Sequence, residues 1–292
     1  MEPGRNHEYS FGMTATSMRS PPPPAPHTHI GALLRDWRAV RRLSQLDLAL
    51  AADVSSRHLS CVETGRAQPS REMVARLAQT LELPLREQNA LLAAAGYAPE
   101  FRESTITAPE MSTARKAIDL ILHKQDPYPA IVMNRHWDLL MANDSTTRIF
   151  RWLLDGPPSQ SNIMKTFFDP AGVRPRVVNW EECAGDLIRH LHNDLAAAPS
   201  DSRMRELMRD VLAYPEVPER WAKRQLPAPV PSLSTITYRK ADVELTFFWT
   251  MTTFGTPHDV MLDELRIECS FPADEATDRF CRELADSAVS QA

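Results

Sequence analysis

Residues 45–65 read QLDLALAADVSSRHLSCVETG. Two short stretches with helical spacing are separated here by only a few residues. Ser44 and Ser55 precede the two stretches, and Gly65 follows the second one. A serine oxygen accepts hydrogen bonds from the free amides of a first helical turn, and glycine readily takes the left-handed conformation that ends a helix. The pattern therefore predicts two capped helices joined by a tight turn.

The apolar spacing within this stretch predicts how the two helices pack. Leu48, Leu59 and Val62 supply the contacts, and Ala49 is small where the two backbones approach each other. The turn carries Asp53 in the place where glycine is usual, and aspartate tolerates a positive φ better than most residues. These features favour a helix-turn-helix, whose second helix lies in the DNA major groove, over an ordinary helical hairpin of a bundle.

Short or polar side chains point outward from the second predicted helix. Such groups are expected on a surface that contacts base edges and phosphates. They are Ser56, Arg57, His58, Ser60 and Cys61.

Residues 55–99, SSRHLSCVETGRAQPSREMVARLAQTLELPLREQNALLAAAGYAP, resemble the xenobiotic-response-element (XRE, Cro/C1-type) repressor family. The resemblance covers about residues 29–97 and implies the fold of phage repressors. It implies that Gln45 either contacts the DNA backbone or supports the second helix of the motif, here called the reading helix. It also implies that Arg66 contacts a phosphate. Ser56, Arg57 and Ser60 would face bases, whereas Cys61 is smaller than the usual residue there. The full set of candidate DNA-binding residues is Gln45, Ser55, Ser56, Arg57, His58, Ser60, Cys61 and Arg66.

Composition allows two domains with different tasks. The chain has 292 residues, of which 43% are hydrophobic and 24% charged, so it can bury a core of ordinary size. The net charge of −5 is uneven, because residues 27–97 sum to +2 and residues 98–292 to −7. No apolar run approaches the roughly 18 residues of a membrane span, and no secretory signal is visible. We expect a cytoplasmic protein without a membrane partner.

Cysteine spacing does not indicate a disulfide framework or a zinc site. Cys61, Cys183, Cys269 and Cys281 lie far apart and form no CxxC motif. Free thiols in a reducing cytosol are the expectation.

Four regions follow one another along the chain. Residues 1–26 end in SPPPPAP and are expected to be a disordered tail. Residues 27–100 contain about five short helices and form the helix-turn-helix domain, and 101–110 are a linker. A body over 111–290 starts with an amphipathic helix at 111–125, which could act as a lever between the domains.

The body mixes strands and helices, so the predicted fold class is α+β with an all-α head. Two strands joined by a tight turn are expected at 130–134 and 137–143. Helices are expected near 144–154, 181–196, 202–213, 217–225 and 274–288, and further strands at 234–238, 243–254 and 264–271.

The body also resembles a known family. The stretches YPAIVMNRHWDLLMAN (128–143), RELMRDVLAYPEVPERWAK (205–223) and LTFFWTMTTFGTPHDVMLDELRIECSFPAD (245–274) are similar to the MmyB-like ligand-binding domain. The resemblance implies a PAS-like fold, an antiparallel sheet with helices over one face. It also implies a small apolar ligand, with a fatty acid as the favoured example.

Several residues of the body are candidates for ligand contact. Alternating apolar residues of two strands could line a cavity or could simply be core. Polar side chains nearby could fix a head group, although surface roles for the arginines remain open. The candidates are Trp137, Leu139, Met141, Asn143, Arg220, Trp221, Arg224, Phe247, Trp249 and Met251.

Catalytic and metal sites are not expected. His190 and Asp194 align on one helical face, but His192 points elsewhere, so HLHND is expected to be a solvated helix face. The five lysines form no recognisable pair with a strand serine, as a self-cleaving peptidase would need.

These observations favour a ligand-responsive DNA-binding regulator that acts as a homodimer on an inverted repeat. Two alternatives remain open. One is a constitutive DNA-binding protein whose body only dimerises, and the other is a cytosolic enzyme with a regulatory DNA-binding head.

Overall fold

The computed structural model describes residues 29–198, 201–224 and 233–289, so the disordered tail expected at 1–26 lies outside the described residues. The described chain divides into two compact units. The first, here called the head, contains residues 29–105 together with 256–263. The second, the body, contains the described residues of 106–255 and those from 264 onward. Residues 256–263, which the sequence analysis assigns to the body, thus belong to the head unit.

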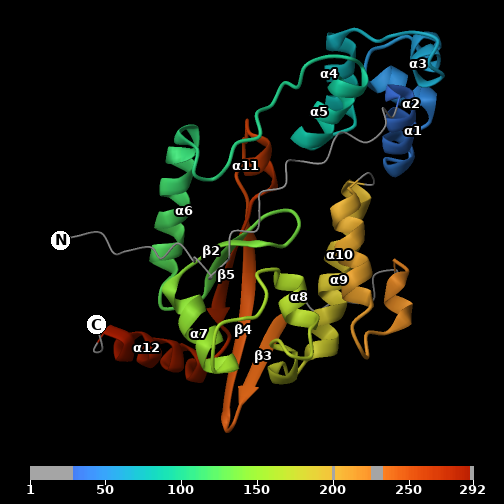
Figure 1. The fold of residues 1–292 in the computed structure, drawn as a ribbon. Helices are drawn as coiled ribbons and strands as arrows, with labels where there is room; N and C mark the ends of the chain where they lie inside the picture. Colours follow the sequence, from blue (N-terminus) through green and yellow to red (C-terminus); the bar gives the residue numbers. More distant parts are fainter. Residues whose placement is uncertain (1–28, 199–200, 225–232, 290–292) are drawn as a thin grey trace. The chain divides into compact units, whose positions relative to one another are not determined.

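The head is helical, as the sequence predicts (Figure 1). Its five N-terminal helices are α1 (Ile30–Val40), α2 (Gln45–Ala51), α3 (Ser56–Glu63), α4 (Arg71–Thr80) and α5 (Leu85–Ala94).

Local hydrogen bonds define the ends of α2 and α3. The Ser44 hydroxyl accepts a hydrogen bond from the Asp47 amide at 3.1 Å, and the Asp47 carboxylate accepts one from the Ser44 amide at 2.9 Å. The Ser55 hydroxyl accepts from the amide of the third residue of α3 at 3.4 Å. Asp53 in the turn has φ 51°, and Gly65 after α3 has φ 76°. The structure confirms the two predicted serine caps, the tight turn at Asp53 and the end of the second helix at Gly65.

Helices α1 and α3 pack in close contact. A Cβ atom at Gly31 would lie 2.3 Å from the carbonyl oxygen of Glu63, so only glycine fits here without a shift of the backbone. The predicted contacts of Leu48, Leu59 and Val62 lie in the fully buried core of the head. The side chains predicted from their spacing are therefore the ones that pack the reading helix α3 into the core of the head.

The body contains an antiparallel sheet of five strands in the order β2-β1-β5-β4-β3. The strands are β1 (Ala130–Met133), β2 (Leu139–Ala142), β3 (Thr235–Lys240), β4 (Val243–Thr252) and β5 (Arg266–Pro272). All five strands predicted for the body are present, and the α+β class is confirmed.

The longer helices of the body also lie close to their predicted positions. They are α6 (Ser112–Gln125), α7 (Asp144–Leu154), α9 (Trp180–Ala197), α10 (Ser202–Leu212) and α12 (Glu275–Val289). The helix predicted at 217–225 is only a 3-10 turn, Glu219–Ala222, because Pro218 before it and Lys223 after it have extended backbone conformations. The short elements Pro109–Met111, α8 (Ile163–Phe168), Arg174–Arg176 and α11 (Val260–Glu264) are not anticipated by the sequence reading.

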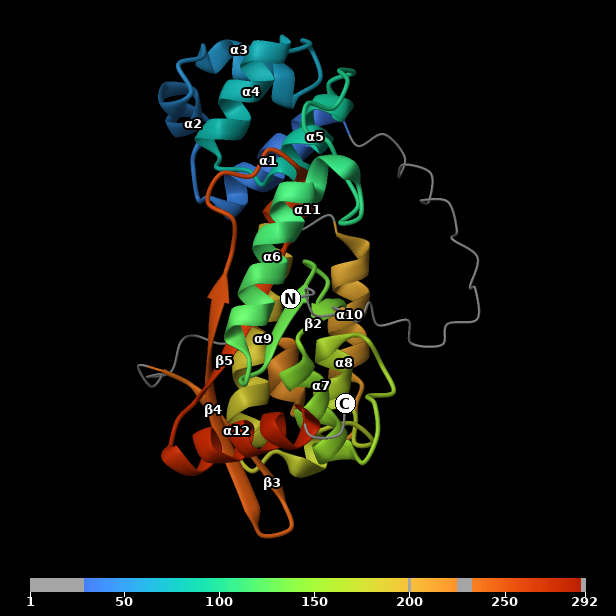
Figure 2. The same ribbon diagram turned by 90° about the vertical axis from the view of Figure 1, so that its left-hand side faces the viewer.

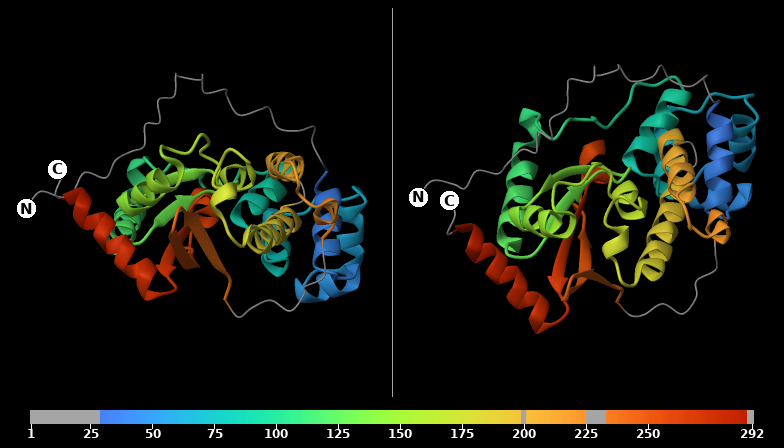
Figure 3. Two further views of the ribbon diagram at one scale, coloured as in Figure 1. Left: turned by 90° about the horizontal axis from the view of Figure 1, so that it is seen from below. Right: turned by 60° about the horizontal axis from the view of Figure 1, so that its bottom comes forward.

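Helices cover both faces of the sheet at β1, whereas the resemblance implied helices over one face. All four residues of β1 are buried, although consecutive side chains point to opposite faces. In Figures 1 and 3, α6 flanks the sheet on one side, α8 to α10 lie on the other, and α12 crosses one end. Figure 2 shows α6 in front of the strands. The larger hydrophobic core lies on the side of α8 and α9.

Candidate DNA-reading helix and ligand cavity

Helix α3 presents a polar, solvent-exposed start. Ser56, Arg57 and His58 are exposed, and Ser60 and Cys61 are half-buried. The exposed guanidinium of Arg57 makes no hydrogen bond or ion pair within the described chain. The same holds for Arg66, just past the end of the helix. Both cations are available to a polyanionic partner.

Gln45 and Ser55 have structural partners. The amide of Gln45 donates a hydrogen bond to Oε2 of Glu63 at 3.0 Å, and Arg38 pairs with the same carboxylate at 3.0 and 3.1 Å. Glu63 is only 3% exposed. Of the two roles open to Gln45, its contacts therefore match the buttress of α3. Ser55 uses its hydroxyl to cap α3, which orients the helix.

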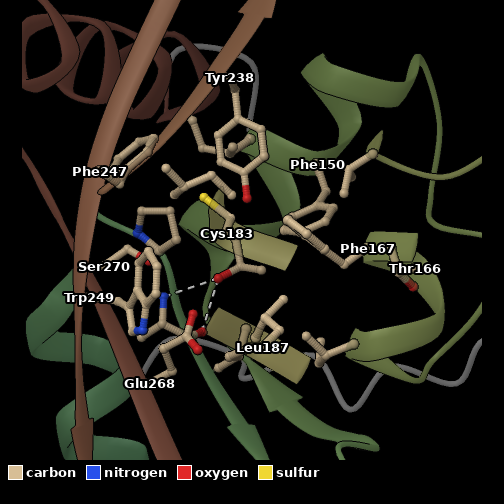
Figure 4. A pocket seen from close by; sticks show the side chains of 18 of the residues that line it. Phe150, Thr166, Phe167, Cys183, Leu187, Tyr238, Phe247, Trp249, Glu268 and Ser270 are labelled. Carbon is tan, nitrogen blue, oxygen red and sulfur yellow. Dashed lines mark hydrogen bonds between the residues drawn. The ribbon is translucent and has the colours of Figure 1, made fainter. Parts of the chain in front are cut away.

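A cavity lies between the sheet and helices α7, α8 and α9 (Figure 4). Its volume is about 110 Å³. A cavity of roughly 10–15 Å³ already holds a water molecule, so this one has room for a small ligand. Its lining residues are Pro129, Ala130, Ile131, Trp137, Thr146, Ile149, Phe150, Ile163, Thr166, Phe167, Val173, Cys183, Leu187, His190, Ile236, Tyr238, Phe247, Trp249, Met251, Glu268 and Ser270.

Four of the ten predicted ligand-contact residues line this cavity. They are Trp137, Phe247, Trp249 and Met251. The apolar face that the alternation along β4 indicates therefore forms part of one wall of the cavity, and its contact with a ligand stays a prediction. Leu139 and Met141 are half-buried on the edge strand β2 and do not line the cavity, because β2 lies beyond β1 at the end of the sheet.

The four head-group candidates are placed elsewhere. Both arginines are exposed and paired, Arg220 with Glu181 at 2.6 Å and Arg224 with Asn193 at 2.9 Å. Trp221 is buried in the core, its ring 6.0 Å from that of Trp180.

Asn143 caps α7 by accepting a hydrogen bond from the Thr146 amide, and it also accepts one from the Ala130 amide. Its side-chain NH₂ donates to the carbonyls of Leu122 and Tyr128. With every polar atom of its amide bound to protein, Asn143 has a scaffold role and does not line the cavity.

The sequence reading missed the polar groups of the cavity. Burial raises the pKa of Glu268 to about 7 and that of Cys183 to about 12, and burial also raises the pKa of Tyr238. Each group is therefore biased toward its neutral form. Strand alternation in RIECS places Glu268 on one face of β5 with Arg266 and Ser270, which was the available signal.

Two comparisons with known proteins bear on this arrangement. Residues 114–284 match the model of the MmyB-like transcription regulator ligand binding domain, over more than half of the chain. The chain belongs to this family. Residues 29–91 match a helix-turn-helix domain model. A search of curated proteins found no match.

The family assignment gives the two units their general roles. This member of the MmyB-like family joins a helix-turn-helix DNA-binding domain to a ligand-binding domain, the organisation of a ligand-responsive transcription regulator. The two resemblances noted in the sequence are thereby confirmed at the level of the helix-turn-helix and the MmyB-like domain.

The acidic, histidine and cysteine side chains of this MmyB-like regulator do not form a metal-binding cluster within the described residues. Within the described residues, no group of three or more His, Cys, Asp or Glu is arranged to hold a metal ion. Asp194 binds both guanidinium nitrogens of Arg266, at 2.6 and 2.9 Å, and accepts a hydrogen bond from the Trp137 indole at 3.1 Å. None of the described helices has the length and apolar character needed to cross a membrane. The four cysteines are free thiols.

Proposed function

We propose that the cavity of the body binds a small apolar ligand and that its occupation changes the affinity of the head for DNA. Mostly aliphatic and aromatic side chains line the cavity, as is usual in small-molecule sites. The fatty acid suggested by the family resemblance is one member of this ligand class. The cavity between four strands of the sheet, β1, β3, β4 and β5, and the helices α7, α8 and α9 is the observation that carries the proposal.

The segment between β4 and β5 supports a route by which a ligand in the cavity could change DNA binding by the head. Strand β4 carries Phe247, Trp249 and Met251 and runs into residues 256–263, which belong to the head unit, before the chain returns as β5. Displacement of β4 by a ligand would therefore act on a segment of the head through covalent continuity.

Two aspartates hold that segment within the head unit. The Asp263 carboxylate accepts a hydrogen bond from the Leu85 amide in the first turn of α5, at 3.0 Å. The Asp259 carboxylate accepts from the Ser104 amide at 3.1 and 3.3 Å, and the Val260 amide donates to the Arg102 carbonyl at 2.8 Å. A ligand shifts DNA affinity only when it binds the DNA-competent and incompetent arrangements unequally.

We also propose the oligomeric state, the type of operator and the class of body fold of this regulator. One reading helix covers a short half-site, so we propose a homodimer that reads an inverted repeat of double-stranded DNA in the manner of XRE repressors. The strand order supports a PAS-like body. A DNA partner supports action in the cytoplasm, and no catalytic group is assigned.

A thermal-shift experiment tests the ligand site. Octan-1-ol should raise the Tm of the wild type, because binding to the folded state stabilises it. Trp249→Ala should bind more weakly and show a smaller shift. Leu122→Ala is the control, since Leu122 is buried but does not line the cavity, so this variant should lose stability and keep the wild-type shift.

The outcomes separate the alternatives. Equal shifts in the wild type and Trp249→Ala would remove Trp249 from the site. No shift with any apolar compound would favour a constitutive DNA-binding protein whose body only dimerises. Turnover of an added acyl compound would favour the enzyme alternative.

A further inference from the structure

Glu268 places a carboxyl group without a protein partner on the wall of an apolar cavity. It lies in the middle of β5, opposite Ile131 of β1 and Met251 of β4. In Figure 4 its carboxyl group points into the cavity below Trp249. The carboxyl group makes no hydrogen bond or ion pair to the described residues, in contrast to the neighbouring acid Asp194, which is fully paired.

The cavity offers this carboxyl group no cation. No lysine or arginine is among the lining residues. The guanidinium of Arg266, two residues away on the same strand, is held by Asp194. His190 lines the cavity from α9, but it is exposed and lies at the rim. A negative charge on Glu268 is therefore uncompensated by the described residues, which is costly in apolar surroundings.

Aromatic rings surround the same space. Tyr238, Phe247 and Trp249 line it, and the rings of Tyr238 and Phe247 are 6.4 Å apart at 61°. Aromatic faces attract cations, and a group of rings is the usual surrounding of a bound ammonium ion. A carboxylate beside such rings combines two features that favour a positively charged nitrogen.

We propose that the cavity accepts an amphiphilic amine, whose protonated nitrogen pairs with Glu268 and whose apolar body lies against the aromatic rings. This inference rests on the proposed function, since it names the chemical class of the ligand for the same cavity. The cavity, of about 110 Å³, has room for a small amphiphile.

The proposal reverses the expected charge of the ligand head group. A fatty carboxylate would place a second negative group beside Glu268 and would bind only with a proton held between the two acids. An ammonium group instead satisfies Glu268 and restores its charged form. Burial raises the pKa of Glu268 to about 7, so the carboxyl group can lose its proton near neutral pH when a cation binds beside it.

Three probes with the same chain length separate the effect of head-group charge on affinity from that of apolar contact. The probes are n-octylamine, octan-1-ol and octanoate, titrated into the full chain by calorimetry at pH 8. We expect octylamine to bind at least about tenfold more tightly than octanol, and octanoate to bind most weakly. In Glu268→Gln the preference for the amine over the alcohol should disappear, while the alcohol binds as in the wild type.

A matched acid controls for net charge. Glu244 lies on the exposed surface of β4 and pairs with Arg239 at 2.5 Å. Glu244→Gln removes the same charge from the same sheet and should leave all three affinities unchanged. Glu268→Gln should fold at least as stably as the wild type at pH 8, since no native partner is lost.

The pH dependence gives a second readout. Octylamine remains protonated between pH 6 and 8, whereas Glu268 loses its proton in this range, so the affinity of the wild type for the amine should rise with pH. Other titratable groups facing the cavity are Tyr238 of β3 and the Cys183 thiol of α9, whose raised pKa values keep them neutral, and His190 of α9. Any slope that persists in Glu268→Gln would come from a group other than Glu268.

Each result decides between the two proposals. Tighter binding of octanol than of octylamine, or an unchanged amine preference in Glu268→Gln, would overturn the amine inference and leave the apolar ligand site standing. Failure of all three probes to bind would overturn both. Loss of the amine preference only in Glu268→Gln would establish the pairing.

Discussion

The side-chain amide of Gln45 lies 3.0 Å from Oε2 of Glu63 and donates a hydrogen bond to it. This contact joins the first residue of α2 to the last residue of α3, so it fixes the two helices of the reading motif against each other. Arg38 of α1 pairs with the same carboxylate through two nitrogens. A buried acid with a hydrogen-bond donor and a cation therefore sets the orientation of the reading helix.

Removal of the Gln45 contact should loosen the reading helix. We expect Gln45→Ala to cost the head about 1 kcal/mol of stability, because one hydrogen bond to a charged, buried group is lost. DNA affinity should fall for all sequences alike. Amide hydrogen exchange of α2 and α3 measures the first effect. The exposed Gln79 is the control, and Gln79→Ala should change neither quantity.

Arg57 and Arg66 should differ in what they contribute to DNA binding. Arg57→Ala should weaken binding to the preferred sequence by about 1–3 kcal/mol and relax the preference at one base pair, if it reads a base edge. Arg66→Ala should weaken all sequences and flatten the salt dependence of binding, since a phosphate contact is lost. Competition assays over a range of salt concentrations measure both effects. Equal behaviour of the two variants would contradict this division of roles.

The segment 256–263 should transmit the effect of a ligand. Asp259→Ala and Asp263→Ala remove the side-chain hydrogen bonds that hold it within the head unit. We expect each variant to bind DNA and octan-1-ol with nearly wild-type affinity, while the effect of octan-1-ol on DNA affinity becomes smaller. DNA titrations with and without the alcohol measure this coupling. Full coupling in the double variant would require a different route between the units.

Asp201 should make the stability of the body depend on acid pH. Burial opposes the charge of Asp201, but hydrogen bonds from His136 and the Met204 amide, with the charge of Arg135, hold its pKa well below the usual range. Because the folded-state pKa is lowered, this stabilisation is complete above the unfolded-state pKa of about 4 and is lost as the pH falls below it.

Asp201→Asn tests this dependence, since asparagine keeps an oxygen that can cap the helix but loses the charge that pairs with Arg135. At pH 7 the variant should be less stable by about 3 kcal/mol, and the difference should shrink below about pH 4. Urea unfolding at several pH values measures it. A difference that stays constant down to pH 2 would show that the charge is not the cause.

The sequence predicts most of the fold because its signals are local. The serine caps, the positive φ of Asp53 and the alternation of β4 each follow from a few neighbouring residues. The short helix α8 was missed because six residues, IMKTFF, show no clear helical period. Its position depends on packing against distant parts of the chain.

The candidate site could be predicted only in part, for a related reason. Residues of β4 were found because one apolar face is visible in a single stretch. Glu268 was missed because the sequence shows an acid in an alternating strand, which ordinarily faces water. Asn143 was assigned to a ligand, but its amide caps α7 and makes three further hydrogen bonds to backbone groups that are distant in the sequence.

The affinity of the full chain for DNA, measured with the cavity empty and filled, tests the central claim most directly. A duplex selected from a random pool by the purified protein would serve as the operator, and fluorescence anisotropy would report binding at constant salt. With saturating octan-1-ol or n-octylamine, whichever binds more tightly, the account predicts at least about a fivefold change in Kd for the wild type. An operator Kd that is the same with the cavity filled as with it empty would contradict the account.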